Sequence, residues 1–354
     1  MQLLAEAAAR LPFPVENPWG SAQTGSAPAL ARFDAGWYGS IARDGYSIDL
    51  LGGQSNIAFF PLFPLLARAL AGASGISFAA AGLAVSLVAL LTACGLLARR
   101  ENAASWDGLG AVIALLAWPA SFFLASVYTE SLFLALALVA SRSAERERWG
   151  PAALAGFLAA LTRPNGFLVA LLVAPQAFAA WRRSPRAAPA AFVATLAPLA
   201  GLATFLSYLG IRFGDPFAGF RALSAWGRLP GQSGAHLLGR VRDLAERLAG
   251  FQRGYGLVEL LEVGSLAVFA VLTLLLFRER RFGEGLYSAG VLSVVVLNGS
   301  LVGAHRYVLV LFPCFALLGK LLARSRMALV LYVFAGAGLG VTLMTRFVLW
   351  VFVG

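Results

Sequence analysis

Residues 76–98 read ISFAAAGLAVSLVALLTACGLLA, a predominantly apolar run without a charged side chain. A transmembrane helix needs about 20 such residues, so this run has the length to cross a bilayer. Arg99 and Arg100 follow it directly. Because arginine and lysine concentrate in cytoplasmic loops, the pair predicts a membrane helix that ends at the cytoplasmic face.

The remainder of the chain repeats this pattern of apolar runs and basic clusters. The runs cover about residues 108–125, 130–141, 151–162, 166–181, 189–211, 256–277, 285–299, 306–322 and 327–350. The later basic clusters lie at 142–148, 182–186, 278–281 and 320–326. Each interval between clusters holds two runs, which predicts an all-α polytopic membrane protein of about ten transmembrane helices. The runs 130–141 and 151–162 are too short to span alone and predict half-helices, or helices extended by adjacent polar residues.

Composition supports this class and excludes others. Hydrophobic residues make up 59% of the 354 and charged residues 13%, against roughly 25% charged in soluble domains. The net charge of +11 comes from clusters between apolar runs, so we predict membrane lipid and no nucleic acid as a partner. Cys94 and Cys314 lie inside apolar runs without metal-ligand spacing, which predicts neither disulfide nor metal site. The single lysine, Lys320, suggests a GC-rich bacterial genome and hence a bacterial plasma membrane.

The unusual polar segments all fall on the face opposite the basic clusters, which predicts an extracytoplasmic site. They are the loop containing Asp34, SVYTES (126–131), TRPNG (162–166), the 212–255 loop and VGAHRY (302–307). We expect one domain over 1–354, with an irregular segment at 1–31, a first external loop with interfacial helices at 32–72, and a second external loop at 212–255. Segment 1–31 shows neither a signal peptide nor a transmembrane helix, so an external first loop requires a translocated N-terminus or a further helix upstream.

The first external loop carries a carboxylate cluster among aromatic residues. It contains RFDAGWYGSIARDGY (32–46) and NIAFFPLFP (56–64). Asp34 is either a catalytic base or the N-cap of a helix. Asp44 precedes a glycine and either sets a turn or supports the site, and Asp49 is a solvated loop residue. Such a loop suits an enzyme that joins a water-soluble hydroxyl to a lipid-borne donor.

Further charged residues interrupt the apolar runs. Glu130 begins a run, where a helix N-terminus favours a carboxylate and where sugar binding is an equal alternative. Arg163 needs a partner anion, because a lone arginine at membrane depth costs about 2.5–3.5 kcal/mol. That partner is a lipid phosphate, Glu130 or Asp34. His305 and Arg306 meet at the predicted external surface and favour a phosphate clamp.

The FFPLFP segment predicts a kinked interfacial element. Pro61 and Pro64 oppose an ordinary helix interior, and phenylalanine prefers the acyl-chain boundary. Phe59, Phe60 and Phe63 are candidates to line a groove for a lipid tail.

Five of these motifs together resemble the PIG-V-like mannosyltransferases, bacterial relatives of the second GPI mannosyltransferase in the GT-C class of membrane glycosyltransferases. The motifs are 32–46, NIAFFPLFP, SVYTESLF (126–133), LTRPNG (161–166) and HRYVLVLFP (305–313), in the family order. The chain departs from the family at Phe33, where tryptophan usually precedes the aspartate, and in lacking an obvious first helix.

The resemblance implies a GT-C fold and inverting transfer of a sugar, mannose, from a polyprenyl-phosphate donor to a glycan, lipid or protein acceptor. It implies a catalytic acidic residue in the first external loop, for which we select Asp34 as general base. We predict that the donor is bound by Asp44, Tyr38, Glu130, Arg163, Asn165, His305, Arg306 and Tyr307. The chain has no DxD motif, so we expect metal-independent transfer and no cofactor.

Other functions compete with this hypothesis. A transporter or flippase for a lipid-linked sugar would also place arginine and aromatic residues in the membrane, although its polar site usually lies near the midplane between two repeated halves. A GT-C enzyme that uses arabinose, glucose or galactose is equally compatible with the residues. A structural scaffold would leave the Asp34 loop and Arg163 unexplained.

Overall fold

The computed structural model describes residues 29–49, 53–99, 106–227, 238–239, 242, 246, 256–298 and 300–353. Within these ranges the protein is entirely helical, as predicted, and contains no strand. Most of the predicted irregular segment 1–31 and most of the predicted external loop 212–255 lie outside the described residues.

Five of the described helices are long and apolar enough to cross a membrane. They are α4 (Phe78–Ala98), the continuous segment Pro164–Arg183 that contains α8 (Ala170–Arg183), α9 (Ala188–Phe213), α12 (Gly256–Arg278) and α16 (Arg326–Val348). A sixth candidate is broken: α14 (Ala304–Tyr307) with the 3₁₀ turn η7 (Val308–Val310) meets α15 (Phe312–Leu322) at an angle of 89°. Helix length therefore establishes a polytopic membrane protein with five or six candidate spans, about half of the predicted crossings.

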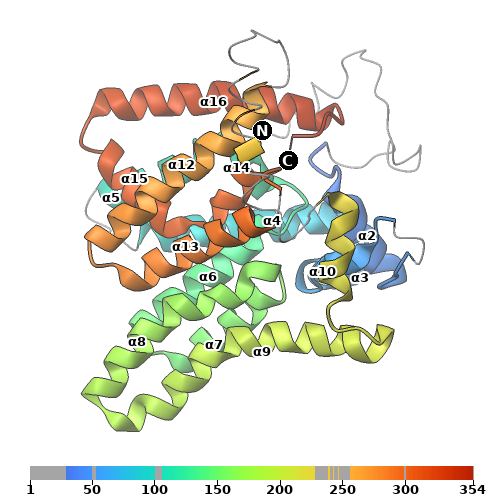
Figure 1. Ribbon diagram of the computed structural model, residues 1–354, viewed down its shortest axis with the longest axis horizontal. Helices are drawn as coiled ribbons and strands as arrows, with labels where there is room; N and C mark the ends of the chain where they lie inside the picture. Colours follow the sequence, from blue (N-terminus) through green and yellow to red (C-terminus); the bar gives the residue numbers. More distant parts are fainter. Residues whose placement is uncertain are drawn as a thin grey trace.

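The other helices are shorter. They include α5 (Trp106–Leu116), α6 (Glu130–Glu145), α7 (Trp149–Ala160) and α13 (Phe282–Leu297). The predicted short runs at 130–141 and 151–162 are thus confirmed as short helices, α6 and α7. Figure 1 shows α6 in the middle of the bundle, with α8, α7 and α9 below it and α16 across the top.

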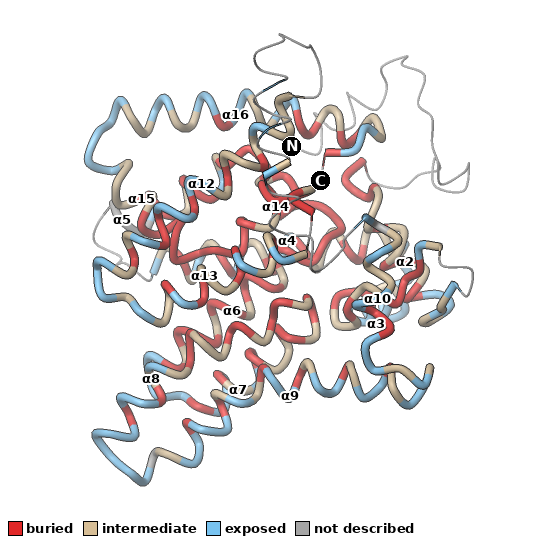
Figure 2. The backbone as a smooth tube through the Cα atoms, in the orientation of Figure 1, coloured by how far each residue is buried: buried red, intermediate tan, exposed pale blue. Residues whose placement is uncertain are grey.

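Burial follows the same arrangement. Figure 2 shows the buried backbone concentrated in the middle of the molecule, while α9 and α16 carry long exposed stretches. Large apolar side chains are exposed on α4, α9, α12 and α16, for example Leu91, Phe192, Leu274 and Phe334. Apolar outer faces of this extent are expected where the surrounding medium is lipid.

Local sequence explains several boundaries and contacts. α4 and α16 both begin after a serine, Ser77 and Ser325, whose hydroxyl oxygen accepts a backbone N–H from the first turn. α5 and α15 approach closely where Gly110 faces Gly319, since a Cβ atom on Gly110 would lie 3.0 Å from the Gly319 carbonyl oxygen. Small residues permit such contact between membrane helices.

One end of the bundle gathers the short elements of the first loop. α2 (Asp34–Asp44), the 3₁₀ turn η2 (Asn56–Ala58) and α3 (Leu62–Ser74) lie there beside α10 (Ala218–Ala222), as Figure 1 shows. Asn56 joins them, because its side-chain amide donates to Ser40 and to the Gly45 carbonyl and accepts from the Ser47 backbone N–H. Of these elements, α2 and η2 contribute residues to one wall of the candidate site.

Candidate active site

A cavity of about 620 Å³ opens between the first loop and the bundle. Six separate stretches of the chain line it: the start of α2 with η2, the turn before α6, the turn before the 3₁₀ helix η4 (Pro164–Val169), Leu223 with Ala225, the end of α13 with the approach to α14, and the C-terminal segment. Nine of the predicted site residues line this cavity: Asp34, Tyr38, Phe59, Phe60, Glu130, Arg163, Asn165, Arg306 and Tyr307. The structure thus brings together residues that the sequence spreads over more than 270 positions.

Asp34 is the first residue of α2, and the residue before it has a positive φ angle. The preceding residue, Phe33, has φ 49° and ψ −108°, a left-handed conformation that costs free energy in any residue except glycine. The helix has no side-chain cap, and the Asp34 backbone N–H instead donates to the Tyr128 hydroxyl at 3.4 Å. The N-cap role weighed for Asp34 is therefore not the one observed. Its carboxylate, 24% exposed, points to a cation.

That cation is Arg306. Its Nη1 donates to Oδ2 of Asp34 at 3.0 Å, and its Nε lies 3.4 Å from Oε1 of Glu130. Three aromatic rings, Phe123, Tyr128 and Tyr307, surround the guanidinium at 5.0–5.2 Å. The rings exclude water and add cation–π attraction, so they and the two carboxylates together stabilise a largely buried guanidinium.

Arg163 forms the second half of the charged cluster. Its Nη1 lies 2.7 Å from Oε1 of Glu130, and the side chains are 9% and 1% exposed. Of the partners considered for Arg163, the structure therefore provides Glu130. Glu130 is also the first residue of α6, as expected from its position at the start of an apolar run. Two arginines and two carboxylates thus balance in charge around one cavity.

The break between α14 and α15 positions Arg306. Gly303 is the N-cap residue before α14 and has φ 81°, and its backbone N–H donates to the buried carboxylate of Glu262 at 3.1 Å. Backbone carbonyls released by the break find other donors: Trp118 donates to the His305 carbonyl and Tyr287 to the Val310 carbonyl. Such compensation is required where a helix is interrupted in an apolar environment.

Two buried oxygen atoms at the cavity lack a hydrogen-bond donor within the described part of the chain. They are Oε2 of Glu130 and Oδ1 of Asn165. A buried acceptor without a partner is costly, about 1–3 kcal/mol. Both atoms are hydrogen-bond acceptors, and both belong to residues that line the cavity.

Tyr38 closes the cavity beside Asp34. Burial, together with the nearby Asp34 and Glu130 carboxylates, raises the pKa of the Tyr38 phenol well above its ordinary value. The phenol therefore remains protonated at physiological pH and can only donate or accept a hydrogen bond. It cannot serve as the base of a reaction in this cavity.

Aromatic rings form the apolar part of the lining. Trp37 stacks on Phe59 with ring centroids 6.0 Å apart, and Phe60 lies beside them in the same wall. Phe63 does not line the cavity: it is fully buried and packs against Tyr38. The helical turn of α3 that begins after Pro61 rotates Phe63 into the core, which explains why it departs from the predicted groove.

Two other predicted residues also lie away from the cavity lining. Asp44 ends α2 on the surface, with its side chain 70% exposed and 3.8 Å from Arg43. His305 is completely buried and is not one of the residues that line the cavity. The packing of α14 therefore places His305 in the core and not in the predicted phosphate clamp beside Arg306.

The C-terminal segment contributes lining residues that the sequence analysis did not identify. Trp350 and Phe352 line the cavity, and both contact the strained Phe33, with ring centroids 5.4 and 5.6 Å apart. The guanidinium of Arg32 lies over the Trp350 ring at 5.0 Å. The sequence signal that could have identified Trp350 and Phe352 is a pair of aromatic residues at the end of an apolar run. Thr129, whose hydroxyl accepts from Arg163 at 3.3 Å, was also missed.

The described residues contain no group of three or more His, Cys, Asp or Glu that could hold a metal ion. Comparison of the chain with protein-family models, with curated proteins and with solved structures finds no match. The geometry of the cavity is therefore the basis of the functional argument.

Proposed function

We propose that this protein is a membrane glycosyltransferase of the GT-C class, with the fold of that class and the crossings, about ten, that the apolar runs predict. In the proposed reaction, a sugar, mannose, moves from a polyprenyl-phosphate donor to a hydroxyl of a glycan, lipid or protein acceptor. The cavity would face the extracytoplasmic side of a bacterial plasma membrane. The observation that carries the proposal is the meeting of Asp34, Glu130, Arg163 and Arg306 in one aromatic-walled cavity.

The two arginines suit the leaving phosphate. Charge-assisted hydrogen bonds from guanidinium to phosphate are short and directional. Arg306 and Arg163 now pair with carboxylates, and a bound phosphate would compete with those carboxylates for the same N–H groups. Its arrival would weaken the hold of Arg306 on Asp34 and leave the aspartate free to accept a proton.

Asp34 is suited to act as general base. In the proposed step its carboxylate takes the proton of the acceptor hydroxyl while the hydroxyl oxygen forms a bond to the anomeric carbon. The bond between that carbon and the phosphate oxygen breaks on the opposite face, and the electron pair leaves with the lipid phosphate, which the arginines stabilise. The configuration at the anomeric carbon inverts.

The rest of the lining supports binding of the donor. The unpartnered oxygens of Glu130 and Asn165 are acceptors for sugar hydroxyl groups. Trp37, Phe59 and Phe60 offer an apolar wall for the first isoprene units. A lipid-linked sugar combines these requirements: an anionic centre, a hydroxyl-rich head and an apolar tail.

The test is a transfer assay with purified protein in detergent, radiolabelled polyprenyl-phosphate mannose and lipid extract from the source organism, with the product identified by mass. Asp34→Asn should abolish transfer but retain donor binding, because the amide has the same shape and cannot take the proton. Asp44→Asn is the matched control: it makes the same change at an exposed aspartate outside the lining, and it should retain transfer. Full turnover by Asp34→Asn would exclude the proposed base.

The broken α14–α15 helix also favours a second candidate, a transporter of lipid-linked sugars, because transporters often build their sites from interrupted helices. A transporter would make no glycosidic bond in detergent but would move labelled lipid between leaflets of a vesicle. Leaflet exchange without product from any acceptor would favour this alternative.

A further inference from the structure

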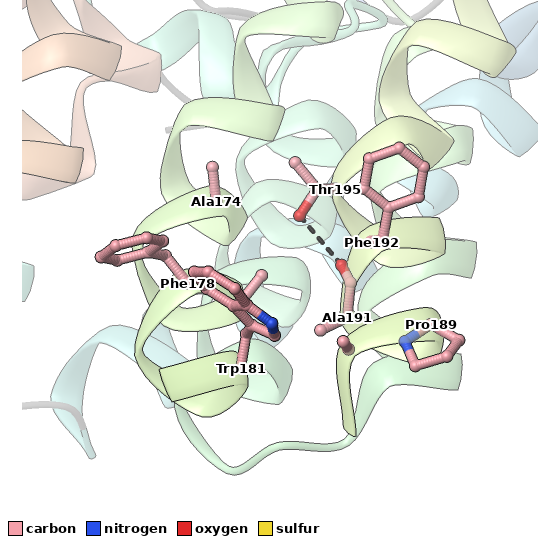
Figure 3. Close-up of a pocket in the computed structure, with 9 residues that line it drawn as sticks. Ala174, Phe178, Trp181, Pro189, Ala191, Phe192 and Thr195 are labelled. Carbon is pink, nitrogen blue, oxygen red and sulfur yellow. Dashed lines mark hydrogen bonds between the residues drawn. The ribbon is translucent and has the colours of Figure 1, made fainter. Parts of the chain in front are cut away.

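A second cavity lies far from the candidate active site, between α8 and α9. It encloses about 530 Å³ and is lined by Ala174, Ala177, Phe178, Trp181, Ala188, Pro189, Ala191, Phe192 and Thr195. Figure 3 shows Phe178 and Trp181 on one side of this α8–α9 crevice and Phe192 on the other. On α8 the lining residues follow the i, i+3, i+4, i+7 spacing of a single helical face.

The interior of the crevice is apolar. Its only side-chain hydroxyl, that of Thr195, donates to the Ala191 carbonyl of its own helix at 2.9 Å, the bond drawn in Figure 3. Phe178, Trp181 and Phe192 are all exposed, so the crevice opens outward. An open groove of this composition is suited to a hydrocarbon chain.

The rim of the crevice is basic. Arg182 and Arg183 end α8, and Arg186 lies in the short segment that joins α8 to α9; all three are exposed. The Arg182 guanidinium lies 5.9 Å from the Phe178 ring centroid, directly at the crevice. Arg183 pairs with Glu147 at 2.7 Å, which brings the basic turn between α6 and α7 to the same end. Within the described part of the chain, Arg186 has no ion-pair partner.

The dimensions match one leaflet of a membrane. Ala174 lies eight residues before Arg182, which corresponds to about 12 Å of helix. Half of a hydrocarbon core of about 30 Å is about 15 Å. A basic rim above an apolar groove of this depth would place a phosphate at the membrane surface and its acyl chain among the aromatic rings.

The crevice is also too small to enclose a whole helix from a second copy. A helix with its side chains is about 10–12 Å across, and a 12 Å length of it fills roughly 1,000 Å³. That is nearly twice the volume of the crevice. An acyl chain is much narrower.

We infer that the α8–α9 crevice binds an anionic phospholipid, with its headgroup phosphate at Arg182 and Arg186 and one acyl chain between Phe178, Trp181 and Phe192. The arginine excess at this end assigns the lipid to the cytoplasmic leaflet. This site does not depend on the proposed glycosyltransferase activity and lies apart from its cavity.

The test measures quenching of Trp181 fluorescence in the purified full-length protein by phospholipids with brominated acyl chains. Phosphatidylglycerol and phosphatidylcholine with the same brominated chains are titrated in parallel. Subtracting the signal of Trp181→Phe isolates this residue from the other seven tryptophans. We expect phosphatidylglycerol to quench Trp181 at a lower mole fraction than phosphatidylcholine.

Matched variants test the two parts of the site. Arg182→Gln with Arg186→Gln should raise the half-quenching fraction of phosphatidylglycerol by about fivefold for each arginine removed. Arg278→Gln with Arg324→Gln removes the same charge from other basic clusters and should leave the half-quenching fraction of phosphatidylglycerol unchanged. Ala174→Leu narrows the groove and should weaken Trp181 quenching by both lipids, with an unchanged size-exclusion profile showing that the protein is folded.

Three outcomes would overturn the inference. Equal quenching by the two lipids would show that the crevice does not select an anionic headgroup. If Arg278→Gln with Arg324→Gln raised the half-quenching fraction of phosphatidylglycerol as much as Arg182→Gln with Arg186→Gln, the lipid would be attracted by the net charge of the protein and not bound at the crevice. A third outcome is a dimer in which neither lipid quenches Trp181. If Ala174→Leu dissociates that dimer, a second copy of the chain occupies the crevice.

Discussion

The buried pair between Glu130 and Arg163 offers a sharp test of the structure, because the chain contains an exposed pair of the same geometry. Glu130 and Arg163 approach to 2.7 Å with side chains 1% and 9% exposed. Glu147 and Arg183 also approach to 2.7 Å, with side chains 46% and 67% exposed. Each glutamate can be changed to glutamine, which keeps the shape and removes the charge.

The two substitutions should differ in cost because burial differs. Removing one member of a buried ion pair leaves an uncompensated charge and costs about 3–5 kcal/mol. Glutamine can still accept a hydrogen bond from Arg163, so Glu130→Gln should lower the free energy of unfolding by about 3 kcal/mol. An exposed ion pair contributes about 0–1 kcal/mol, so Glu147→Gln should change the free energy of unfolding very little.

The assay is unfolding of the purified protein by sodium dodecyl sulfate in mixed micelles, followed by circular dichroism. Glu130→Gln should unfold at a clearly lower detergent fraction than wild type, and Glu147→Gln at nearly the same fraction. Equal shifts for both variants, or a larger shift for Glu147→Gln, would refute the buried placement of the Glu130 side chain and with it the charged cluster of the cavity.

Three further predictions follow from the site and from the charge pattern. Arg306→Ala should weaken binding of a polyprenyl-phosphate sugar by about 1.5–3 kcal/mol, measured by titration calorimetry, because the phosphate loses a charge-assisted partner; unchanged affinity would exclude a role in the clamp. Gly303→Ala should destabilise the protein by about 1–2 kcal/mol in detergent unfolding, because alanine is strained at φ 81°. Cysteine at Ser47, but not at Ser184, should react with an impermeant thiol reagent in intact cells, and the reverse pattern would contradict the predicted topology.

The sequence alone determined much of this protein because the relevant signals are local. A long apolar run specifies a helix by its own hydropathy, and α4, α9, α12 and α16 lie close to the predicted runs. Polar residues within apolar surroundings are costly and therefore stand out. Asp34, Glu130, Arg163 and Arg306 could be selected for this reason before any contact between them was known.

Orientation within an element was less predictable. Asp44 and Phe63 belong to motifs that contribute to the cavity, yet one ends on the surface and the other in the core. His305 is adjacent to Arg306 but is fully buried and does not line the cavity. A motif fixes the order of residues, whereas the rotation of each helix is set by what packs against it.

Only the tertiary structure decided which charges meet. Arg306 and Asp34 are 272 positions apart and pair because the 89° break before α15 turns α14 toward the start of α2. The return of Trp350 and Phe352 to Phe33 depends in the same way on where α16 packs. Such contacts arise from the summed packing of many helices, and no local pattern encodes them. The sequence predicts that a charged side chain within an apolar run needs a partner of opposite charge. The fold alone determines which partner that is.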